Sequence, residues 1–508
     1  MQRALGDLIE PLTGRRWTGA DTERQVARRL AAYADAGLRR GDRVFLQFGN
    51  CLEFFAELLA IWHAGGCAVP IDPRFTAFEI ETLAAWTRPR LASYLGAPDA
   101  DAAAALGRTG VALMDVMAGR ATPAAAPPSA LRLDDDALIL FTSGTTGQPK
   151  GVVHTHRSLL ARWTSLRDHL GLDAYTRTLC LLPTHFGHGL ICNCLYPWLS
   201  GNDLYVLPPF KPDILAQLGA ILDEHRITFM SSVPSVWRLA LRIAAAPKQA
   251  SLARVFIGSA PLSASLWDSV RQWTAAPDVF NAYGITETGS WLAGTTVPGF
   301  APEDGLVGKP WGGELFVSAS SEPATGLAPD NVRKANEAGH VWVRTPALMR
   351  GYLDRDDLTG RVVSGGWFLT GDIGLVDERG WLYLRGRERE EINKGGMKVH
   401  PADIDSVIER FPATRDVCAF AFPEALLGED VGVAVVLSAV DDKTVLELYD
   451  WTTRHLARHQ VPQRWYLVAD IPRTSRGKVS RPAVAEHCGH LAPLNIGALR
   501  ARAGSSRT

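Results

Sequence analysis

The sequence predicts an α/β fold: a large N-terminal domain of two mostly parallel sheets with helices, a small β-barrel-like subdomain, and a small α+β C-terminal domain. Three observations support this prediction. The chain has 508 residues, more than one hydrophobic core can organise. Helix and strand patterns alternate through the first half of the chain. They give way to short strands after Glu314 and to a compact mixed order after Gly386.

The alternation in the first half follows from changes in hydrophobic period. Apolar residues recur at helical spacing in some segments, and short apolar runs bounded by Gly, Asp and Pro lie between them. We expect helices at 22–36, 52–63 and 212–225, and strands at 43–48, 67–71, 178–182, 203–207, 228–231 and 254–257. This order is typical of parallel sheets joined by crossover helices.

The second half contains the change of architecture. Short strands expected at 315–318, 340–344 and 382–384 are separated by Gly, Pro and Asp turns, which indicates an antiparallel or barrel-like unit. The C-terminal pattern predicts strands at 398–400, 417–422, 432–437 and 465–468, and helices at 401–411 and 443–455. A run dense in charge separates the two patterns. We predict an N-terminal domain at 1–386, a hinge at 387–391 and a C-terminal domain at 392–508, with weak order after Ala485.

Composition excludes several classes of partner. Lys and Arg total 53 against 54 Asp and Glu, a formal net charge of -1, so no overall field favours nucleic acid or an acidic membrane. Seven scattered cysteines suit reduced thiols better than a disulfide framework. The most apolar stretches are interrupted by charged residues and glycines, so we expect neither a signal peptide nor a membrane span. These features predict a cytoplasmic protein, and its oligomeric state stays open.

The segment 140–152 has the composition of a phosphate-binding loop. It contains three glycines, four hydroxyls and a lysine just after an apolar run. Glycines let successive backbone N–H groups turn toward one anion, and the hydroxyls and lysine add donors and charge. A flexible linker is the alternative, which Pro149 and the flanking apolar strands disfavour. The candidate phosphate ligands are Thr142, Ser143, Gly144, Thr145, Thr146, Gly147 and Lys150.

Five blocks, at 140–152, 281–287, 368–372, 386–405 and 472–481, occur in the order found in one family. Through them the chain resembles the ANL superfamily of adenylate-forming enzymes, which contains acyl-CoA and aryl-CoA synthetases, adenylation domains and firefly luciferase. The resemblance implies two half-reactions. A carboxylate first attacks the α-phosphorus of ATP to give acyl-AMP and pyrophosphate, and a thiol then displaces AMP. The implied cofactors are ATP, Mg²⁺ and CoA, or a carrier-protein pantetheine in place of CoA.

The same resemblance assigns the nucleotide site. Glu287 is the expected Mg²⁺ ligand, because a hard cation on phosphate oxygens prefers carboxylate oxygen, and Thr286 would contact the α-phosphate. Tyr283 offers an aromatic face to adenine, while Asp372 and Arg387 would bind the ribose. The other residues assigned to the nucleotide are Ser259, Ala260, Pro261, Asn281, Ala282 and Gly284. Taken alone, several of these stretches would be ordinary turns.

Lys478 is the predicted adenylation lysine, since a mobile ammonium can reach both the attacking carboxylate and the α-phosphate. In isolation it would instead be a solvated lysine in an Arg/Ser-rich loop. Members of the family rotate the small domain about one hinge residue, usually Asp or Lys, and here the matching residue is Arg389. After that rotation the segment formed by Lys394, Gly395, Gly396, Met397 and Lys398 would face the nucleotide site and admit the pantetheine arm.

By the same resemblance, the acyl pocket is lined by His185, Phe186, Gly187, His188, Gly258 and Trp291. Residues 183–190 contain no acidic side chain, which disfavours a free amino acid as substrate. A bulky Trp291 would shorten the cavity, so we expect a small to medium or an aromatic acid. His185 is also a candidate catalytic residue that could act as a gate between the two half-reactions.

Several alternatives stay open on sequence alone. His185, His188, Cys192 and Cys194 are all potential zinc ligands, although their spacing fits no standard signature. The thiol could belong to CoA or to a carrier protein. The chain could also oxidise its adenylate as luciferase does, or be a non-catalytic nucleotide-binding relative.

Overall fold

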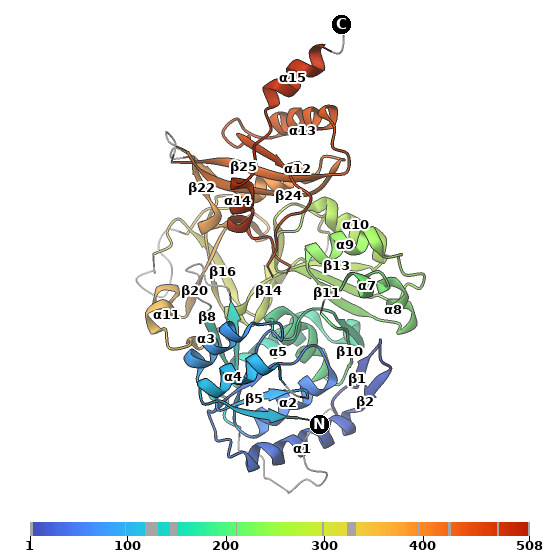
Figure 1. Ribbon diagram of the computed structural model, residues 1–508, viewed down its shortest axis with the longest axis vertical. Helices are drawn as coiled ribbons and strands as arrows, with labels where there is room; N and C mark the ends of the chain where they lie inside the picture. Colours follow the sequence, from blue (N-terminus) through green and yellow to red (C-terminus); the bar gives the residue numbers. More distant parts are fainter. Residues whose placement is uncertain are drawn as a thin grey trace.

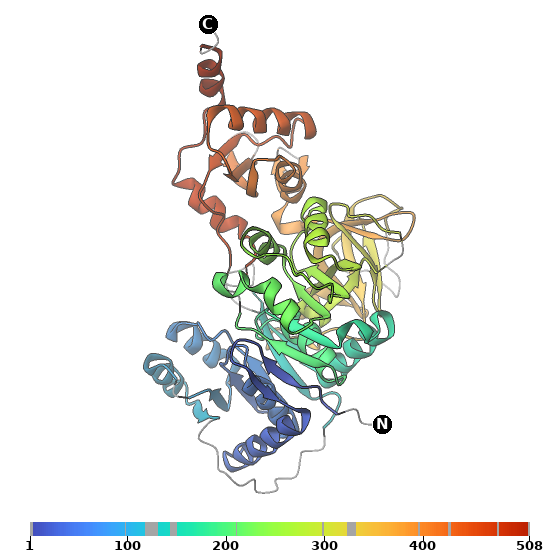
Figure 2. The ribbon, with the colours of Figure 1, turned by 90° about the vertical axis from the view of Figure 1, so that its right-hand side faces the viewer.

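The computed structural model describes residues 4–96, 98–116, 131–142, 150–209, 211–296, 299–322, 332–394, 397–424, 428–474 and 477–505. The segments from β22 onward, orange to red, form a unit at one end of the molecule, and the N-terminal helices and strands lie at the opposite end (Figures 1 and 2). The arrangement confirms the predicted α/β fold class.

One sheet of the N-terminal part is built mainly from parallel strands. Its order is β18 (Gly351–Tyr352), β8 (Lys150–Thr155), β7 (Asp136–Thr142), β4 (Cys67–Pro70), β3 (Arg43–Leu46), β5 (Leu91–Tyr94) and β6 (Ala112–Asp115). The strands from β7 to β6 run parallel, whereas β8 and β18 are antiparallel additions. Helices α1 (Gly19–Asp35), α2 (Leu52–His63), α3 (Ala77–Thr87) and α4 (Ala100–Arg108) come from the same region of the chain.

The second sheet begins with seven strands, six of which run parallel to one another. In order they are β2 (Arg15–Trp17), β1 (Leu8–Glu10), β10 (Asp203–Val206), β9 (Arg177–Cys180), β11 (Phe229–Ser232), β12 (Arg254–Gly258) and β13 (Asp278–Ile285), and only β2 is antiparallel to its neighbour. Their helices are α5 (His156–Leu170), α6 (Tyr196–Trp198), α7 (Pro212–Leu215), α8 (Leu218–Glu224), α9 (Pro234–Ile243) and α10 (Ala264–Thr274). The helix expected at 212–225 is therefore two shorter helices.

The short strands of the second half form an antiparallel extension of this second sheet. They are β14 (Ser290–Gly294), β15 (Leu306–Pro310), β21 (Leu382–Arg387), β20 (Trp367–Val376), β17 (Gly339–Arg344) and β16 (Glu314–Ser318), with β19 (Val363–Ser364) beside β20 and α11 (Asp356–Val362) before it. Gly284 lies where β13 meets β14, and a Cβ there would be 1.9 Å from the Ser290 carbonyl oxygen. Glycine is therefore required for this close approach.

The C-terminal part has its own five-stranded sheet. Its strands are β22 (Ile392–Lys394), β23 (Met397–Val399), β24 (Thr414–Glu424), β25 (Gly428–Leu437) and β26 (Arg464–Leu467), and its helices are α12 (Pro401–Glu409), α13 (Asp442–His455), α14 (Arg481–Gly489) and α15 (Ile496–Ser505). Weak order after Ala485 was the wrong expectation for α14, because Val484 and Cys488 are buried against the core containing Phe420. The predicted domain boundaries stay a prediction, with the 3₁₀ helix η4 (Glu388–Glu390) inside the predicted hinge.

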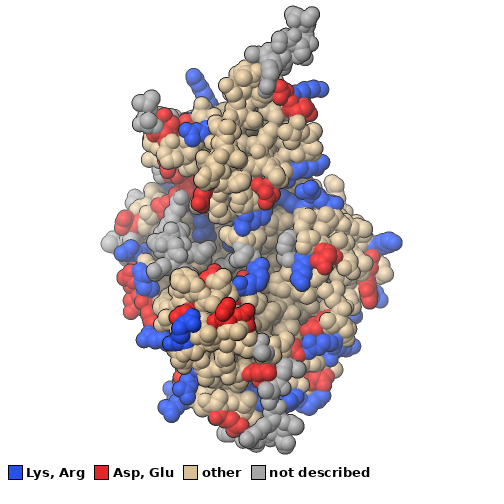
Figure 3. Space-filling view, viewed as in Figure 1, with Lys and Arg blue, Asp and Glu red and all other residues tan. Residues whose placement is uncertain are grey.

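Surface charge agrees with the balanced composition. Figure 3 shows basic and acidic side chains interspersed over both ends of the visible face. Among the described residues, no helix is both long and apolar enough to cross a membrane.

Candidate active site

The candidate site lies where parallel strands of the second sheet end. The chain leaves β9 toward His185 and His188, β11 ends at Ser232, β12 ends at Gly258, and β13 leads into Thr286. Ligands of α/β proteins bind at the carboxyl ends of parallel strands. The strand order therefore brings together segments that are about a hundred residues apart in sequence.

Asn50 joins the two parallel sheets at this edge. It follows β3 of the first sheet, and its Nδ2 donates to the carbonyl oxygens of Leu182 and Leu207, at 2.8 and 2.9 Å. Its Oδ1 accepts from the backbone N–H of Thr184 at 3.0 Å. The amide therefore fixes the segment that leads to His185.

His188 is a neutral imidazole held between two serines. It begins the π-helix η2 (His188–Leu195), and π-helical turns are frequent at functional sites. Ser231 Oγ donates to the Phe256 carbonyl at 3.3 Å, so it accepts from His188 Nε2 at 2.6 Å. Ser259 Oγ, 2.8 Å away, then donates to Nδ1. Burial, with a smaller effect of Lys478, lowers the pKa of His188 to about 3.

Ser259 adopts an unusual backbone conformation to make this contact. Its φ is +66°, in the left-handed region that non-glycine residues rarely occupy. The preceding Gly258 has no space for a side chain, because a Cβ would lie 2.2 Å from the Ala282 carbonyl oxygen. Strained backbone of this kind clusters at functional sites.

Bulky side chains surround His188. The Trp291 ring lies 5.5 Å from the imidazole and 4.8 Å from the Phe256 ring, and Trp291 is only 2% exposed. Phe186 is also buried. Gly187 lies close to Leu140 and Ser290, at 3.4 and 3.8 Å from the position a Cβ would take.

The zinc alternative is not supported. Among the described residues, no group of three or more His, Cys, Asp and Glu side chains is arranged to hold a metal ion. His188 is committed to the two serines, and His185 Nε2 lies 3.5 Å from a carboxylate oxygen of Asp72. Asp72, from the loop after β4, is also held by the guanidinium of Arg74 at 2.8 Å. His185 therefore packs against the first sheet.

A second cluster joins Tyr283, Asp372 and Arg387. The Tyr283 hydroxyl donates to Asp372 Oδ2, and Arg387 Nε lies 2.9 Å from Oδ1 of the same carboxylate. Burial and the nearby Asp372 raise the pKa of Tyr283 well above its usual range, and Asp372 also raises the pKa of Arg387. The carboxylate can accept further hydrogen bonds, since it offers about four lone-pair positions.

A third cluster lies beside the predicted phosphate segment. Residues 143–149, which carry most of the predicted phosphate ligands, lie outside the described residues. The strands on either side pair Thr142 with Lys150. Lys150 Nζ lies 4.8 Å from the centre of the Tyr352 ring, and the Tyr352 hydroxyl donates to Glu287 Oε1 at 2.8 Å.

The remaining predicted nucleotide residues have mixed surroundings. Asn281 Nδ2 donates to the Leu306 carbonyl at 2.7 Å, so this nitrogen already anchors β15. Ala282 is buried in β13, Ala260 is half-buried and Pro261 is exposed.

Lys478 reaches this site from the C-terminal part of the chain. Its Nζ lies 5.6 Å from the centre of the Phe186 ring. The adjacent Gly477 approaches α9, where a Cβ on Gly477 would lie 3.1 Å from Ser235 Oγ. The C-terminal unit is therefore docked with its lysine at the carboxyl edge of the second sheet.

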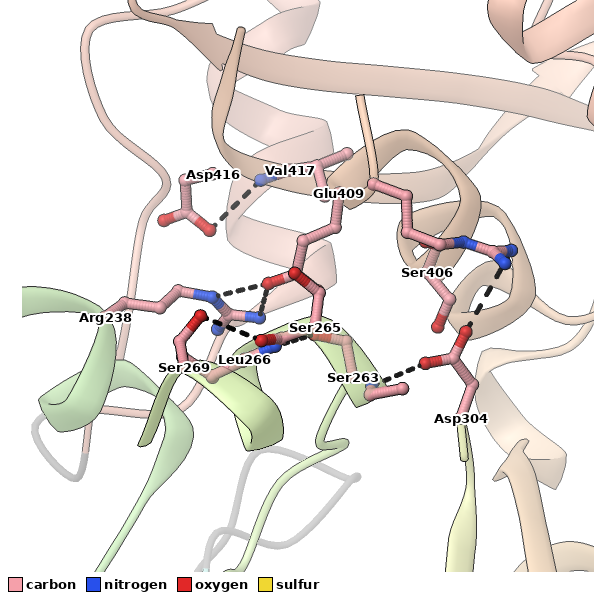
Figure 4. Close-up of polar contacts among 12 residues, drawn as sticks. Arg238, Ser263, Ser265, Leu266, Ser269, Asp304, Ser406, Glu409, Asp416 and Val417 are labelled. Atoms are coloured by element: carbon pink, nitrogen blue, oxygen red, sulfur yellow. Dashed lines mark hydrogen bonds and ion pairs between the residues drawn. The ribbon is translucent and has the colours of Figure 1, made fainter. Parts of the chain in front are cut away.

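Two ion pairs of opposite polarity hold this docked arrangement (Figure 4). Arg238 of α9 contacts Glu409 of α12 at 2.7 Å, with both side chains partly buried. The next residue, Arg410, lies 4.0 Å from Asp304, which also caps the backbone N–H of Ala264 at 2.8 Å. Although burial opposes it, the Glu409 carboxylate raises the pKa of Arg238.

The segment predicted to admit a pantetheine arm is in a different environment. Lys394 Nζ forms a buried ion pair with Asp430 at 2.6 Å, and Met397 is 47% exposed. Gly395, Gly396 and the side chain of Lys398 lie outside the described residues, as does the side chain of the predicted hinge residue Arg389.

Sequence reasoning missed Asn50, Asp72, Arg162, Ser231 and Tyr352. Asp72, Ser231 and Tyr352 contact predicted site residues from distant parts of the chain. Asn50 and Arg162 contact the backbone of Thr184 and Thr288, which are next to His185 and Glu287 in the sequence. No local spacing marks them, because an Asn after a strand or an Arg on an amphipathic helix is an ordinary residue in its own segment.

Two of the buried histidines, His154 and His188, predict acid destabilisation. Burial lowers the pKa of His154 to about 4 and that of His188 to about 3, whereas each is about 6.5 in an unfolded chain. The unfolded state therefore binds protons first as pH falls, and stability is lost from about pH 6.5 downward. Between pH 6.5 and 5 each histidine should remove about 2 kcal/mol. Denaturant unfolding at these two pH values measures the loss.

The control variants separate the histidines from other titrating groups. His154→Gln should reduce the loss over this interval by about 2 kcal/mol, the share of one histidine, whereas the exposed His490→Gln should keep the parental slope. An unchanged slope in His154→Gln would contradict the assignment.

Comparison with known proteins agrees with this geometry. Residues 3–353 match the family described as AMP-binding enzyme, and residues 403–478 match the AMP-binding enzyme C-terminal domain. The chain is 30% identical to an oxalate–CoA ligase of Arabidopsis thaliana, over 92% of each protein, and 28% identical to a long-chain-fatty-acid–CoA ligase of Mycobacterium tuberculosis, over 96% of each. The crystal structure of ATP-bound MatB from Rhodopseudomonas palustris matches with a TM-score of 0.85 and 26% identity, over 97% of each chain. The chain thus belongs to the AMP-binding enzymes, within the ANL superfamily of adenylate-forming enzymes.

Proposed function

We propose that this enzyme uses ATP to activate a small to medium acyl or aryl carboxylic acid as an acyl-adenylate, and then transfers the acyl group to the thiol of CoA. The observation that carries the proposal is the position of Lys478, 5.6 Å from the Phe186 ring, on a unit docked against the second sheet. A lysine brought in by a separate unit can neutralise charge at a reacting centre without being a permanent part of the binding pocket.

The nucleotide would lie between the second and third clusters. Asp372 and Arg387 would bind the ribose hydroxyls, with Tyr283 against the base. Lys150, with the residues of segment 142–147, would hold the β- and γ-phosphates, and Thr286 would contact the α-phosphate. This assignment is supported by the way Tyr352 connects Lys150 to Glu287.

Glu287 fits a magnesium site of the kind that nucleotides bring with them. Mg²⁺ is usually held by one or two carboxylates together with phosphate oxygens and waters, rather than by a cage of protein ligands. Glu287 is half-buried, and one of its oxygens is oriented by Tyr352. When bound, the ion would neutralise part of the negative charge on the phosphates.

The first half-reaction needs the carboxylate and the α-phosphate, both negative, to approach each other. Lys478 would lower that repulsion and stabilise the charge that develops on the α-phosphate oxygens. The carboxylate oxygen bonds to the α-phosphorus, and the bond from that phosphorus to the oxygen that bridges it to the β-phosphate breaks. Pyrophosphate therefore leaves toward Lys150.

The acid would occupy the space beside His188, Phe186 and Trp291. The neutral His188 carries no charge to pair with a second ionic group on the acid, and the aromatic rings around Trp291 limit its length. An acid with a compact apolar or aromatic body fits this lining. His185 would close the mouth of the pocket from its position beside Asp72.

An ATP–pyrophosphate exchange screen with a panel of carboxylic acids tests the proposal. Exchange should depend on small aliphatic or aromatic acids and should be weak with long fatty acids and free amino acids. The active acid should then give a CoA thioester and AMP, measured by mass spectrometry. ATP binding without exchange for any acid would instead favour a non-catalytic relative, and transfer only to a carrier-protein pantetheine would replace CoA as the acceptor.

Lys478→Ala should lower the rate of acyl-adenylate formation at least a hundredfold, because the charge that offsets carboxylate–phosphate repulsion is lost. Binding of MgATP should change little, and this is checked by calorimetry. Pyrophosphate exchange close to the parental rate would remove Lys478 from the reaction.

The interdomain ion pairs predict a charge-swap rescue. Arg238→Ala and Glu409→Ala should each slow pyrophosphate exchange about tenfold, corresponding to about 1.4 kcal/mol, because Lys478 is less often docked. The double variant Arg238→Glu/Glu409→Arg should recover most of the rate. The exposed Arg454→Ala on α13 is the matched control and should keep full activity. Absence of any loss in the single variants would show that the pair does not support docking.

A further inference from the structure

The turn that carries Thr286 and Glu287 is fixed through each of its three carbonyl groups. This turn is the 3₁₀ helix η3 (Thr286–Thr288). The Thr286 carbonyl accepts from His154 Nε2 at 2.8 Å, and the Glu287 carbonyl accepts from the backbone N–H of Met349 at 2.7 Å. The Thr288 carbonyl accepts from Nη2 and Nε of Arg162, at 2.8 and 3.3 Å. The donors come from β8, from the segment before β18 and from α5.

Arg162 connects this turn to its own helix and to two other parts of the fold. Its Nη1 donates to the Trp311 carbonyl at 3.1 Å and to Ser165 Oγ at 3.3 Å. Its Nη2 also lies 3.4 Å from Thr345 Oγ1. One planar guanidinium therefore holds the turn, the residue after β15 and the residue after β17 in a single arrangement.

The electrostatic environment of Arg162 is unusual for a structural residue. The side chain is fully buried, and among the described residues its acceptors are all neutral oxygens, with no carboxylate partner. Burial lowers the pKa of Arg162 to about 10, so the group stays protonated at neutral pH. A buried charge without a counter-charge costs several kcal/mol of stability. Departures from the usual pairing of buried charges are found mainly at functional sites.

The route of the chain links Arg162 to the phosphate segment as well. β8 starts at Lys150 and runs directly into α5, with Thr155 capping the helix at the backbone N–H of Ser158. His154 lies near the end of the same strand and donates to the Thr286 carbonyl. The strand and helix that follow the phosphate segment therefore also carry two of the three donors to the turn.

We propose that Arg162 is a positioning residue for the MgATP site, which it serves by holding the turn of Thr286 and Glu287 against α5, the helix that follows β8. The proposal rests on the proposed function, since it assigns Glu287 to the magnesium of MgATP. Only a forked cation can hold the Thr288 and Trp311 carbonyls together; a lysine ammonium would keep the charge but lose this geometry.

The test compares Arg162→Lys, which keeps the charge, with Arg162→Met, which removes it at similar length. Each variant should raise the dissociation constant of MgATP at least tenfold by calorimetry, and should raise the Mg²⁺ concentration needed for half-maximal pyrophosphate exchange. The KM of the acid should stay within twofold of the parent. A general packing defect would lower the active fraction without moving the metal dependence.

Arg167→Met is the matched control, because Arg167 lies on the same helix but is largely exposed. It should bind MgATP as the parent does. If Arg162→Met does not fold, the MgATP affinity and metal dependence of Arg162→Lys alone test the inference. Parental MgATP affinity and metal dependence in the folded variants would overturn the inference, while the proposed function would stand. A parent that binds no MgATP would overturn the proposed function and this inference with it.

Discussion

Two parallel sheets can build one site only if their strand ends stay fixed relative to each other, and Asn50 supplies that constraint. Its amide donates to carbonyls after β9 and β10 and accepts from the Thr184 N–H, so a single side chain from the first sheet sets the path of a segment in the second. Few side chains other than an amide offer donors and an acceptor together in this compact form. The contact of Asp72 with His185 crosses the same boundary. The pocket wall from His185 to His188 therefore depends on this sheet-to-sheet connection.

The polar side chains of the site are of two kinds: neutral groups that bond to the protein itself, and charged groups that we propose for the ligands. His188 and His154 are buried, neutral and hydrogen-bonded, and serve as rigid spacers between backbone and hydroxyl groups. The side chains proposed to bind ligands include the charged Lys150, Glu287, Asp372, Arg387 and Lys478. Arg162 is the exception, a buried cation held by neutral oxygens behind the turn that carries Glu287. A low-dielectric surrounding strengthens the electrostatic interactions of these charged groups.

The C-terminal unit is held less firmly than the sheets are held to each other. Its docking relies on the pairs Arg238–Glu409 and Arg410–Asp304, which are only partly buried. Ion pairs in such positions contribute modestly to stability and can be broken at low cost. An interface of this kind suits a unit that must deliver Lys478 for one step and withdraw it for another, as the resemblance to domain-rotating enzymes implies. The buried pair Lys394–Asp430 meanwhile keeps the β22–β23 hairpin attached to its own sheet.

The fold class, several helices and many strands could be predicted from the sequence, because hydrophobic period is a local property of the chain. The segments that carry Glu287, Asp372 and Lys478 were predicted through motif spacing and the family resemblance. The side chains that support these segments became visible only in the folded structure. Arg162 meets Thr288 across 126 positions, and Asn50 meets Leu182 across 132, so these contacts depend on strand order and sheet packing. Burial decided the rest: α14 is ordered because Val484 and Cys488 reach a core that its own segment does not contain. A sequence pattern gives no distance between residues that are far apart in the chain. It therefore predicts neither the contacts between them nor the burial that these contacts produce.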